Sequence, residues 1–163
     1  MTVVENAEIA DIDQLVELRL AYLNEDYGDL SENVRKKIRQ DLPDYFKKNL
    51  NQNIFGYLIK EKDKIIACAF LLVVEKPVSP LFITGRTGTV LNVYTDPAHR
   101  HKGYARMIMS RLLSDAVEKD LSVIELKTTE DGYHLYKSVG FTDERLKYHS
   151  MKWYNQSCKR VLE

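Results

Sequence analysis

The chain has 163 residues, 44% of them hydrophobic, and its 24 Lys and Arg residues balance 24 Asp and Glu residues. This length and composition are sufficient for one packed core, and they exclude a disordered or fibrous chain. A balanced charge creates no overall field toward nucleic acid or an anionic membrane, so we expect neither as a partner. We predict a single domain over residues 1–163.

The sequence also indicates the cellular compartment of the protein and the redox state of its cysteines. The N-terminal segment lacks the regions of a signal peptide, and no apolar run reaches membrane-spanning length, so we expect a cytoplasmic protein. The two cysteines, Cys68 and Cys158, lack metal-ligand spacing. We therefore predict reduced thiols and no metal, with Cys68 in the core because it lies in an apolar run.

The first half of the chain predicts one strand and two or three helices. Residues 3–7 are a candidate strand, and Asp11 can cap a helix whose apolar residues recur at helical spacing: Ile12, Leu15, Val16, Leu20 and Leu23. A polar segment, residues 24–32, should follow. Ser31 can cap a second helical region, and Pro43 suits the first turn of a short helix that ends near Leu50.

From residue 54 the hydrophobic period changes from helical to strand-like. Residues 54–60 and 65–74 predict a hairpin, its second strand covered on both faces. A loop with two prolines and two glycines should separate it from a third strand, residues 89–95.

The remaining elements alternate between helix and strand. An amphipathic helix should start after Gly103, residues 122–128 should form a strand, and a short helix over residues 131–139 should end at Gly140. Residues 145–155 alternate enough to predict one or two final strands. The element order is that of a mixed α/β fold.

The most informative stretch is DPAHRHKGYARMIMSRLL, residues 96–113, where a basic turn meets the start of a helix. A helix start exposes unpaired N–H groups and partial positive charge, which together bind anions. Gly103 lets the backbone approach a ligand closely, and Arg100, Lys102 and Arg106 add cations suited to phosphate. The stretch therefore predicts a pyrophosphate site.

Other interpretations of this stretch differ in strength. The glycine patterns of ATP-binding P-loops and of NAD-binding Rossmann turns are missing, so ATP and NAD are disfavoured. A nucleic-acid patch would need more basic residues on one face and exposed aromatic residues. A solvated basic turn before a core helix stays open from these residues alone.

The segment RHKGYA, residues 100–105, matches the pattern [QR]-x-x-G-x-[GA] and resembles the acetyl-CoA turn of the GNAT-type N-acetyltransferases. The segment LYKSVGF, residues 135–141, resembles the second hallmark of that family. The resemblance implies an α/β (α+β mixed) fold: a single GNAT-like domain with a central, mostly antiparallel, twisted sheet, helices on both faces, and strands splayed at the CoA site. It also implies acetyl-CoA as cosubstrate, an amine acceptor and no metal.

The resemblance assigns binding roles to two segments. The backbone of residues 93–95 would pair with the pantetheine arm, with an N–H near Val93 facing the thioester oxygen, and the backbone of residues 101–106 would hold the pyrophosphate. The residues implied to bind acetyl-CoA are Val93, Tyr94, Thr95, Arg100, His101, Lys102, Gly103, Tyr104, Ala105 and Arg106. Where many members carry an asparagine that contacts the CoA arm, this chain has Thr129 or Glu130, and the hydroxyl of Thr128 or Thr129 could replace it.

The catalytic roles are implied in the same way. Tyr136 stands where the family places the phenol that protonates the CoA thiolate, although a packing role for this side chain stays open. Glu25 is the first choice for the general base that deprotonates the amine, because it falls where the family builds its acceptor pocket. Glu75, Glu125 and His134 are its rivals.

The predicted function is transfer of an acetyl group from acetyl-CoA to a primary amine of a small molecule, or to a lysine or N-terminal amine, by direct attack in a ternary complex. A non-catalytic acyl-CoA-binding or sensory domain of the same fold is the alternative, because the binding turn and the chemistry are separable. The acidic residues 24–32 favour a cationic acceptor. The tail around Trp153 and Tyr154 could provide a homodimer surface.

Overall fold

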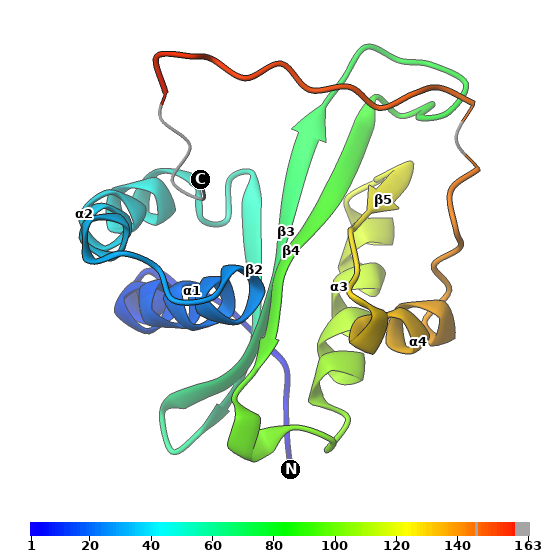
Figure 1. Ribbon diagram of the computed structural model, residues 1–163. Helices are drawn as coiled ribbons and strands as arrows, with labels where there is room; N and C mark the ends of the chain where they lie inside the picture. Colours follow the sequence, from blue (N-terminus) through cyan, green and yellow to red (C-terminus); the bar gives the residue numbers. More distant parts are fainter. Residues whose placement is uncertain (146, 159–163) are drawn as a thin grey trace.

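The computed structural model describes residues 1–145 and 147–158, and its centre is one twisted five-stranded sheet (Figure 1). The strands follow the chain in the order β1-β2-β3-β4-β5. The first three pairs are antiparallel and the last is parallel. The strands are β1 (Glu5–Asn6), β2 (Ile54–Glu61), β3 (Lys64–Glu75), β4 (Arg86–Thr95) and β5 (Val123–Glu125).

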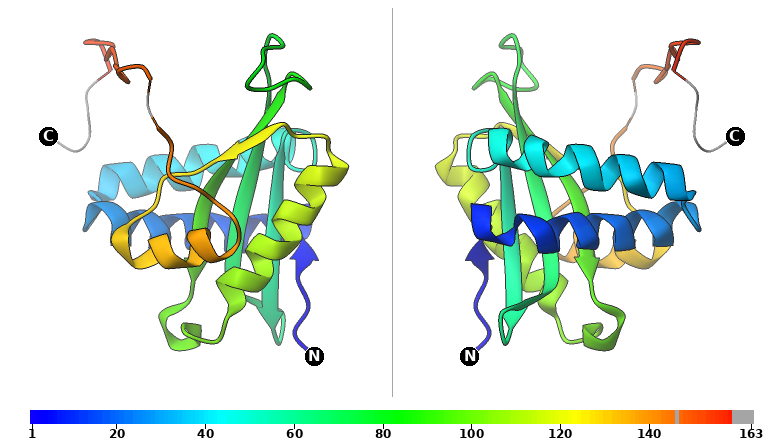
Figure 2. Two further views of the ribbon diagram at one scale, coloured as in Figure 1. Left: turned by 90° about the vertical axis from the view of Figure 1, so that its right-hand side faces the viewer. Right: turned by 90° about the vertical axis from the view of Figure 1, so that its left-hand side faces the viewer.

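Helices cover both faces of the sheet, as Figures 1 and 2 show. On one face lie α1 (Ile12–Tyr27) and α2 (Glu32–Asn49), and on the other α3 (Tyr104–Glu118) and α4 (Glu130–Ser138). Two short 3-10 turns, η1 (Ile9–Asp11) and η2 (Pro97–His99), precede α1 and α3. The predicted fold class, a mostly antiparallel sheet between two layers of helices, is confirmed.

Both faces of strand β3 are buried in the hydrophobic core. Cys68 and Phe70 pack toward α1 and α2, while the alternate residues Ala69 and Leu71 pack toward α3. Burial of the continuous apolar run on both sides confirms the prediction for this strand. The tight turn before it, at Lys62 and Asp63, has φ of 49° and 64°, as a two-residue hairpin turn requires.

Two irregularities of β4 open the sheet. The pairing of β3 with β4 shifts register between Cys68 and Phe70, and opposite this shift Asn92 adopts a left-handed φ of 54°. The parallel pairing of β4 with β5 covers only residues 87–89 and 123–125. Beyond Thr89, β4 continues to Thr95 without β5, and the predicted splayed strands are confirmed.

The structure corrects the predicted helices on the α1/α2 face. The helix α1 continues to Tyr27, so Glu25 and Asp26 belong to its last turns rather than to a polar segment after it. The predicted break before Pro43 is wrong, because α2 runs through it as one helix of 18 residues. Phe46 and Leu50, buried against the sheet, hold the chain helical despite the missing N–H of the proline. The predicted cap at Ser31 is confirmed.

The strands near the C-terminus are shorter than predicted. The predicted strand over residues 122–128 shrinks to β5, and among residues 142–145 and 147–155 no strand forms, although Leu146 lies outside the described residues. Alternation alone does not make a strand, because a strand needs a hydrogen-bonding neighbour. Figure 2 shows the tail leaving the body of the protein beyond α4. Within the described part of the chain, no helix is both long and apolar enough to cross a bilayer.

Candidate active site

A cleft lies where β4 leaves β5, bounded by the end of α1, the turn after η2, the start of α3, and α4. Nine of the ten residues predicted to bind acetyl-CoA line this cleft, and Lys102 is the exception. The two predicted catalytic residues, Tyr136 and Glu25, line it as well. The fold therefore gathers segments from α1, β4, α3 and α4 around one cleft.

The start of α3 faces the cleft with its backbone. The first intrahelical bond that crosses this start runs from the Met107 N–H to the Gly103 carbonyl, at 3.1 Å. The N–H groups of residues 104–106 precede it and have no carbonyl four residues back within the helix. No side chain of the described residues caps this helix start. The open N–H groups and the helix dipole make it suited to an anion.

Two left-handed residues shape the turn before α3. Gly103 has φ of 81° and His101 has φ of 62°. A Cβ added at Gly103 would meet no other atom within 4 Å, so the glycine serves the backbone conformation and keeps the space beside the turn open. Together these residues direct the backbone of the turn around the cleft rim.

The cations of the turn have different partners. Arg100 donates from Nε to the Thr95 carbonyl at 2.9 Å and from Nη2 to Glu25 Oε1 at 2.5 Å. Arg106 donates to the Ser138 hydroxyl at 2.8 Å, which ties α3 to the end of α4. His99, which precedes this turn, contacts Glu61 at 3.1 Å, at the end of β2. Lys102 is exposed on the rim.

Tyr136 extends from α4 into the cleft, and its ring packs edge-on against Phe141 at 6.0 Å between centroids. Burial raises the pKa of its phenol to about 12, with a smaller contribution from the nearby Tyr22. The phenol therefore stays protonated across the physiological range and is available as a hydrogen-bond donor.

Glu25 lies on the α1 wall of the cleft with an exposed carboxylate that is bound by Arg100. Its rivals lie elsewhere. Glu75 stands opposite Arg86 in the β3–β4 register, at the other end of the ladder from Tyr94. Glu125 accepts a 3.4 Å hydrogen bond from the Thr89 hydroxyl, outside the cleft. His134 is on α4 but is not on the face that lines the cleft.

Sequence reasoning missed four residues, Tyr22, Asp131, Gly132 and Leu135, that line the cleft. Tyr22, on α1, faces it, and burial raises the pKa of this phenol, helped by the Asp26 charge. Gly132, on α4, leaves room for the catalytic candidate, since a Cβ there would lie 2.9 Å from Tyr136 Cε2. An isolated glycine inside a short predicted helix is the signal that could have identified Gly132.

Thr129, one of the two threonines considered for contact with the CoA arm, caps α4. Its hydroxyl accepts from the Gly132 N–H at 3.4 Å while the residue also lines the cleft. The Thr128 hydroxyl instead donates to the Thr129 carbonyl at 2.8 Å.

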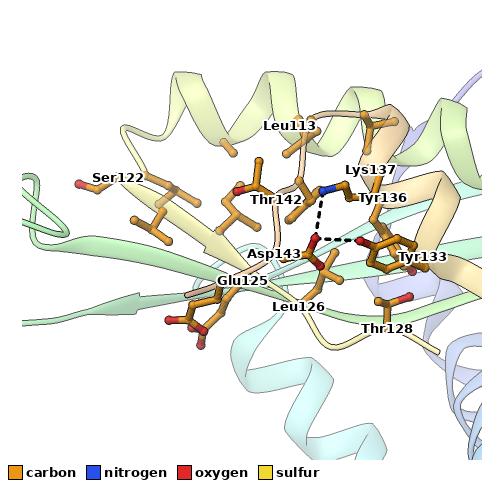
Figure 3. Close-up of a pocket in the computed structure, with 18 of the residues that line it drawn as sticks. Leu113, Ser122, Glu125, Leu126, Thr128, Tyr133, Tyr136, Lys137, Thr142 and Asp143 are labelled. Carbon is orange, nitrogen blue, oxygen red and sulfur yellow. Dashed lines mark hydrogen bonds and ion pairs between the residues drawn. The ribbon is translucent and has the colours of Figure 1, made fainter. Parts of the chain in front are cut away.

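A second hollow adjoins the cleft on the far side of Tyr136, between β5, α3 and α4 (Figure 3). Both apolar and polar side chains line it, and three of the polar ones bind one another. Asp143 accepts from the Tyr133 hydroxyl at 2.8 Å and from Lys137 Nζ at 3.1 Å, and these bonds, that of Tyr133 first, hold the pKa of the Asp143 carboxyl below its usual range. None of the residues predicted to bind acetyl-CoA lines this hollow. Within residues 1–145 and 147–158, no group of three or more His, Cys, Asp or Glu side chains could hold a metal ion.

The residues present fit a long anionic thioester. The unpaired N–H groups of α3 and the open space at Gly103 suit its phosphates, and the β4 backbone beyond its pairing with β5 suits its amide arm. This fold and this cleft are typical of the acetyl-group transferases. The chain belongs to the acetyltransferase (GNAT) family, whose model matches residues 12–141.

Solved structures resemble the chain over almost its whole length. A predicted acetyltransferase from Clostridium acetobutylicum, solved with acetyl-CoA, is 28% identical with a TM-score of 0.78, covering 93% of this chain and 96% of its own. A GCN5-related N-acetyltransferase from Ralstonia eutropha JMP134 has the same fold, at 24% identity and a TM-score of 0.77, covering 93% and 99%. No curated protein matches the chain significantly.

Proposed function

We propose that the protein transfers the acetyl group of acetyl-CoA to a primary amine, of a small molecule or of a lysine or protein N-terminus, by direct attack within a ternary complex. The observation that carries this proposal is that the Tyr136 phenol and the open helix start at Gly103 lie on one cleft at the end of a splayed β4. Bound acetyl-CoA supplies the activated acetyl thioester.

The binding residues have two tasks in this proposal. The backbone of residues 93–95 pairs with the amide arm, and the N–H near Val93 donates to the thioester oxygen and stabilises negative charge as it develops there. The N–H groups at the start of α3 hold the pyrophosphate, and Lys102 and Arg106 add positive charge around it.

Tyr136 provides the proton or hydrogen bond that the departing sulfur needs. A thiol has a pKa of about 8.5, so full proton transfer from a phenol with a pKa of about 12 is uphill by roughly 3.5 pKa units. Tyr136 therefore acts first as a hydrogen-bond donor to the sulfur. As negative charge develops on the sulfur, the proximity of the phenol favours transfer of its proton.

Glu25 is the proposed proton acceptor for the amine. Its carboxylate faces the cleft, but Arg100 binds it. Phosphate oxygens on the neighbouring turn compete for that guanidinium, so binding of acetyl-CoA would free Glu25 to take a proton, directly or through water.

Calorimetric titration of acetyl-CoA into the wild type and into Gly103→Glu tests the binding half of the proposal. We expect binding in the micromolar range that is lost in the variant, because the new carboxylate would point into the open space beside the turn. Gly103→Ala is the matched control: it carries the same backbone strain at φ of 81° without the charge, and it should lose less affinity. A folded wild type that does not bind acetyl-CoA would contradict the proposal.

A thiol-release screen of amines then tests the chemistry. Turnover of any amine supports the transferase. Tight binding of acetyl-CoA without turnover of small amines, lysine peptides or N-terminal peptides would favour a non-catalytic acyl-CoA-binding domain.

Three wider expectations remain predictions. We infer a single domain over residues 1–163, a cytoplasmic location and a homodimer formed through the tail. The tail leaves Tyr148, Met151 and Trp153 exposed, which is consistent with a contact surface. Sedimentation at equilibrium would show the mass of the dimer, and a monomer at every concentration would remove that inference.

A further inference from the structure

Arg19 is a half-buried cation without a carboxylate partner. It lies on α1, and nowhere in the described chain does an Asp or Glu oxygen come within ion-pair distance of its guanidinium. On the neighbouring helix α2, Arg39 by contrast binds Glu17 through two bonds, of 2.9 and 3.1 Å. A partly desolvated guanidinium that lacks a counter-ion favours an anionic ligand.

Two neighbours orient this guanidinium. Its Nη1 donates to the Asn92 side-chain oxygen at 3.3 Å, and its Cζ lies 5.7 Å from the centre of the Tyr22 ring. One donor bond is thus used for positioning, and among residues 1–145 and 147–158 no group accepts a hydrogen bond from the other guanidinium donors.

The residue that anchors Arg19 has an unusual backbone. Asn92 is buried and has φ of 54° in the middle of β4, at the bulge where the register with β3 shifts. A left-handed non-glycine residue in a strand costs energy, and such strain concentrates at ligand sites. Here the bulge holds an amide oxygen against Arg19, while Asn92 Nδ2 contacts Cys68 Sγ at 3.6 Å.

Arg19 lies close to the part of α1 that lines the cleft, where the acceptor amine is proposed to bind. Arg19 and Leu23 line a mainly apolar groove between α1 and α2, and the next residues along the same helix, Tyr22, Glu25 and Asp26, line the cleft. With about 1.5 Å of rise per residue, Arg19 lies roughly 5 Å along the axis from Tyr22 and roughly 9 Å from Glu25. The Arg19 guanidinium thus adjoins the cleft through Tyr22, a cleft residue whose ring centre lies 5.7 Å from its Cζ.

We propose that the acceptor amine also carries a carboxylate, which Arg19 binds, so that the substrate is a small zwitterion with an apolar body. This inference rests on the proposed function and narrows it, because the acidic end of α1 alone would favour a polycation. The amine faces Glu25 and Asp26 in the cleft, the carboxylate faces Arg19, and the carbon chain between them passes the Tyr22 ring.

Matched substrate pairs test the proposal. Each ω-amino acid from aminopropanoate to aminohexanoate is compared with the alkylamine that lacks only the carboxylate, so that the reacting amine stays similar. We expect the best amino acid to have a KM about tenfold to a hundredfold below its alkylamine in the wild type, as for a hydrogen bond between charged groups. In Arg19→Gln this ratio should collapse toward one, and Arg19→Lys should restore part of it.

Controls separate binding from structural damage. Arg39→Gln removes the same charge from the same pair of helices and should leave the ratio intact. A wild type with no preference for the carboxylate, or an Arg19→Gln variant whose KM rises equally for both members of a pair, overturns the proposal while leaving acetyl transfer in place. An aminoalkyl phosphate that surpasses every carboxylate also overturns the choice of carboxylate.

A direct titration distinguishes this failure from a failure of the proposed function. Aminohexanoate and hexylamine are titrated into the wild type and Arg19→Gln in the presence of CoA. Arg19-dependent binding of aminohexanoate with no turnover of any amine would show that the anion site stands and the transferase proposal fails. No such binding, whatever the turnover, overturns the anion site.

Discussion

Arg100 and Glu25, separated by 75 positions in the chain, form a 2.5 Å ion pair across the mouth of the cleft. The pair connects the last turns of α1 with the turn that precedes α3. Arg100 also lies over the Tyr94 ring, at 5.7 Å from its centre. A residue predicted for the cofactor and a residue predicted for the acceptor are therefore in direct contact.

Glu25→Gln tests the proton-acceptor role. We expect kcat to fall about 10²-fold, because the amide cannot take a proton from the amine. The Kd of acetyl-CoA should change little. Steady-state kinetics over pH, with calorimetry for Kd, make the measurement. An unchanged kcat with a raised KM for acetyl-CoA would instead assign Glu25 to the positioning of Arg100.

Tyr136→Phe removes only the hydroxyl and leaves the ring against Phe141. We expect kcat to fall about 10²-fold with little change in acetyl-CoA affinity, since the hydroxyl assists the departing sulfur. Because the pKa of Tyr136 is about 12, the wild type should show no loss of rate from its ionisation below about pH 11. Full activity of the variant would reduce Tyr136 to a packing residue.

Gly132→Ala should affect activity more than stability. The new Cβ would lie 2.9 Å from the Tyr136 ring and 2.8 Å from the Thr128 hydroxyl, so the ring has to move. Alanine favours a helix over glycine by about 1 kcal/mol, which offsets part of the strain. We expect a reduced kcat with Tm lowered slightly or not at all. A fully active variant would show that the ring position is not critical.

Alkaline pH should destabilise the protein through groups that burial keeps protonated. Burial raises the pKa of Cys68 and of Tyr136 to about 12, and it raises the pKa of Tyr57 as well. The unfolded chain releases these protons from about pH 9 upward while the folded chain retains them, so the unfolded state binds fewer protons. Stability should therefore be independent of these groups below about pH 8 and fall between about pH 9 and 12.

Thermal unfolding as a function of pH makes that measurement, and Cys68→Ala is its comparison. The variant lacks one buried acid, so the slope of its unfolding free energy above pH 9 should be shallower by up to about 1.4 kcal/mol per pH unit. Equal slopes in both proteins would contradict a buried, protonated thiol.

Asn92 gives a prediction on stability alone. Asn92→Ala loses the contacts with Arg19 and Cys68 and keeps the strain at φ of 54°, whereas Asn92→Gly loses the same contacts but relieves the strain. We expect the glycine variant to be more stable than the alanine variant by about 1 kcal/mol in urea denaturation. The opposite order would show that the bulge is not strained.

The sequence alone determined the features that depend on neighbours in the chain. The helix start after Gly103, the hairpin predicted for residues 54–60 and 65–74, and the two-faced burial of β3 follow from local periodicity and backbone chemistry. The motif at residues 100–105 pointed to the family, and the family model agrees. Each of these patterns spans about one helix, strand or turn, so the residues that produce it are neighbours in the sequence.

Only the tertiary structure decided how the side chains of distant elements combine. Pairings such as Arg100 with Glu25, or Arg19 with Asn92, join residues more than 70 positions apart and leave no local signal. The same holds for α2, which continues through Pro43 because Phe46 and Leu50 pack on the sheet, and for the tail, whose alternation lacks a neighbouring strand among the described residues. Packing partners outweigh local preference wherever their contacts stabilise the chain more than the preference costs.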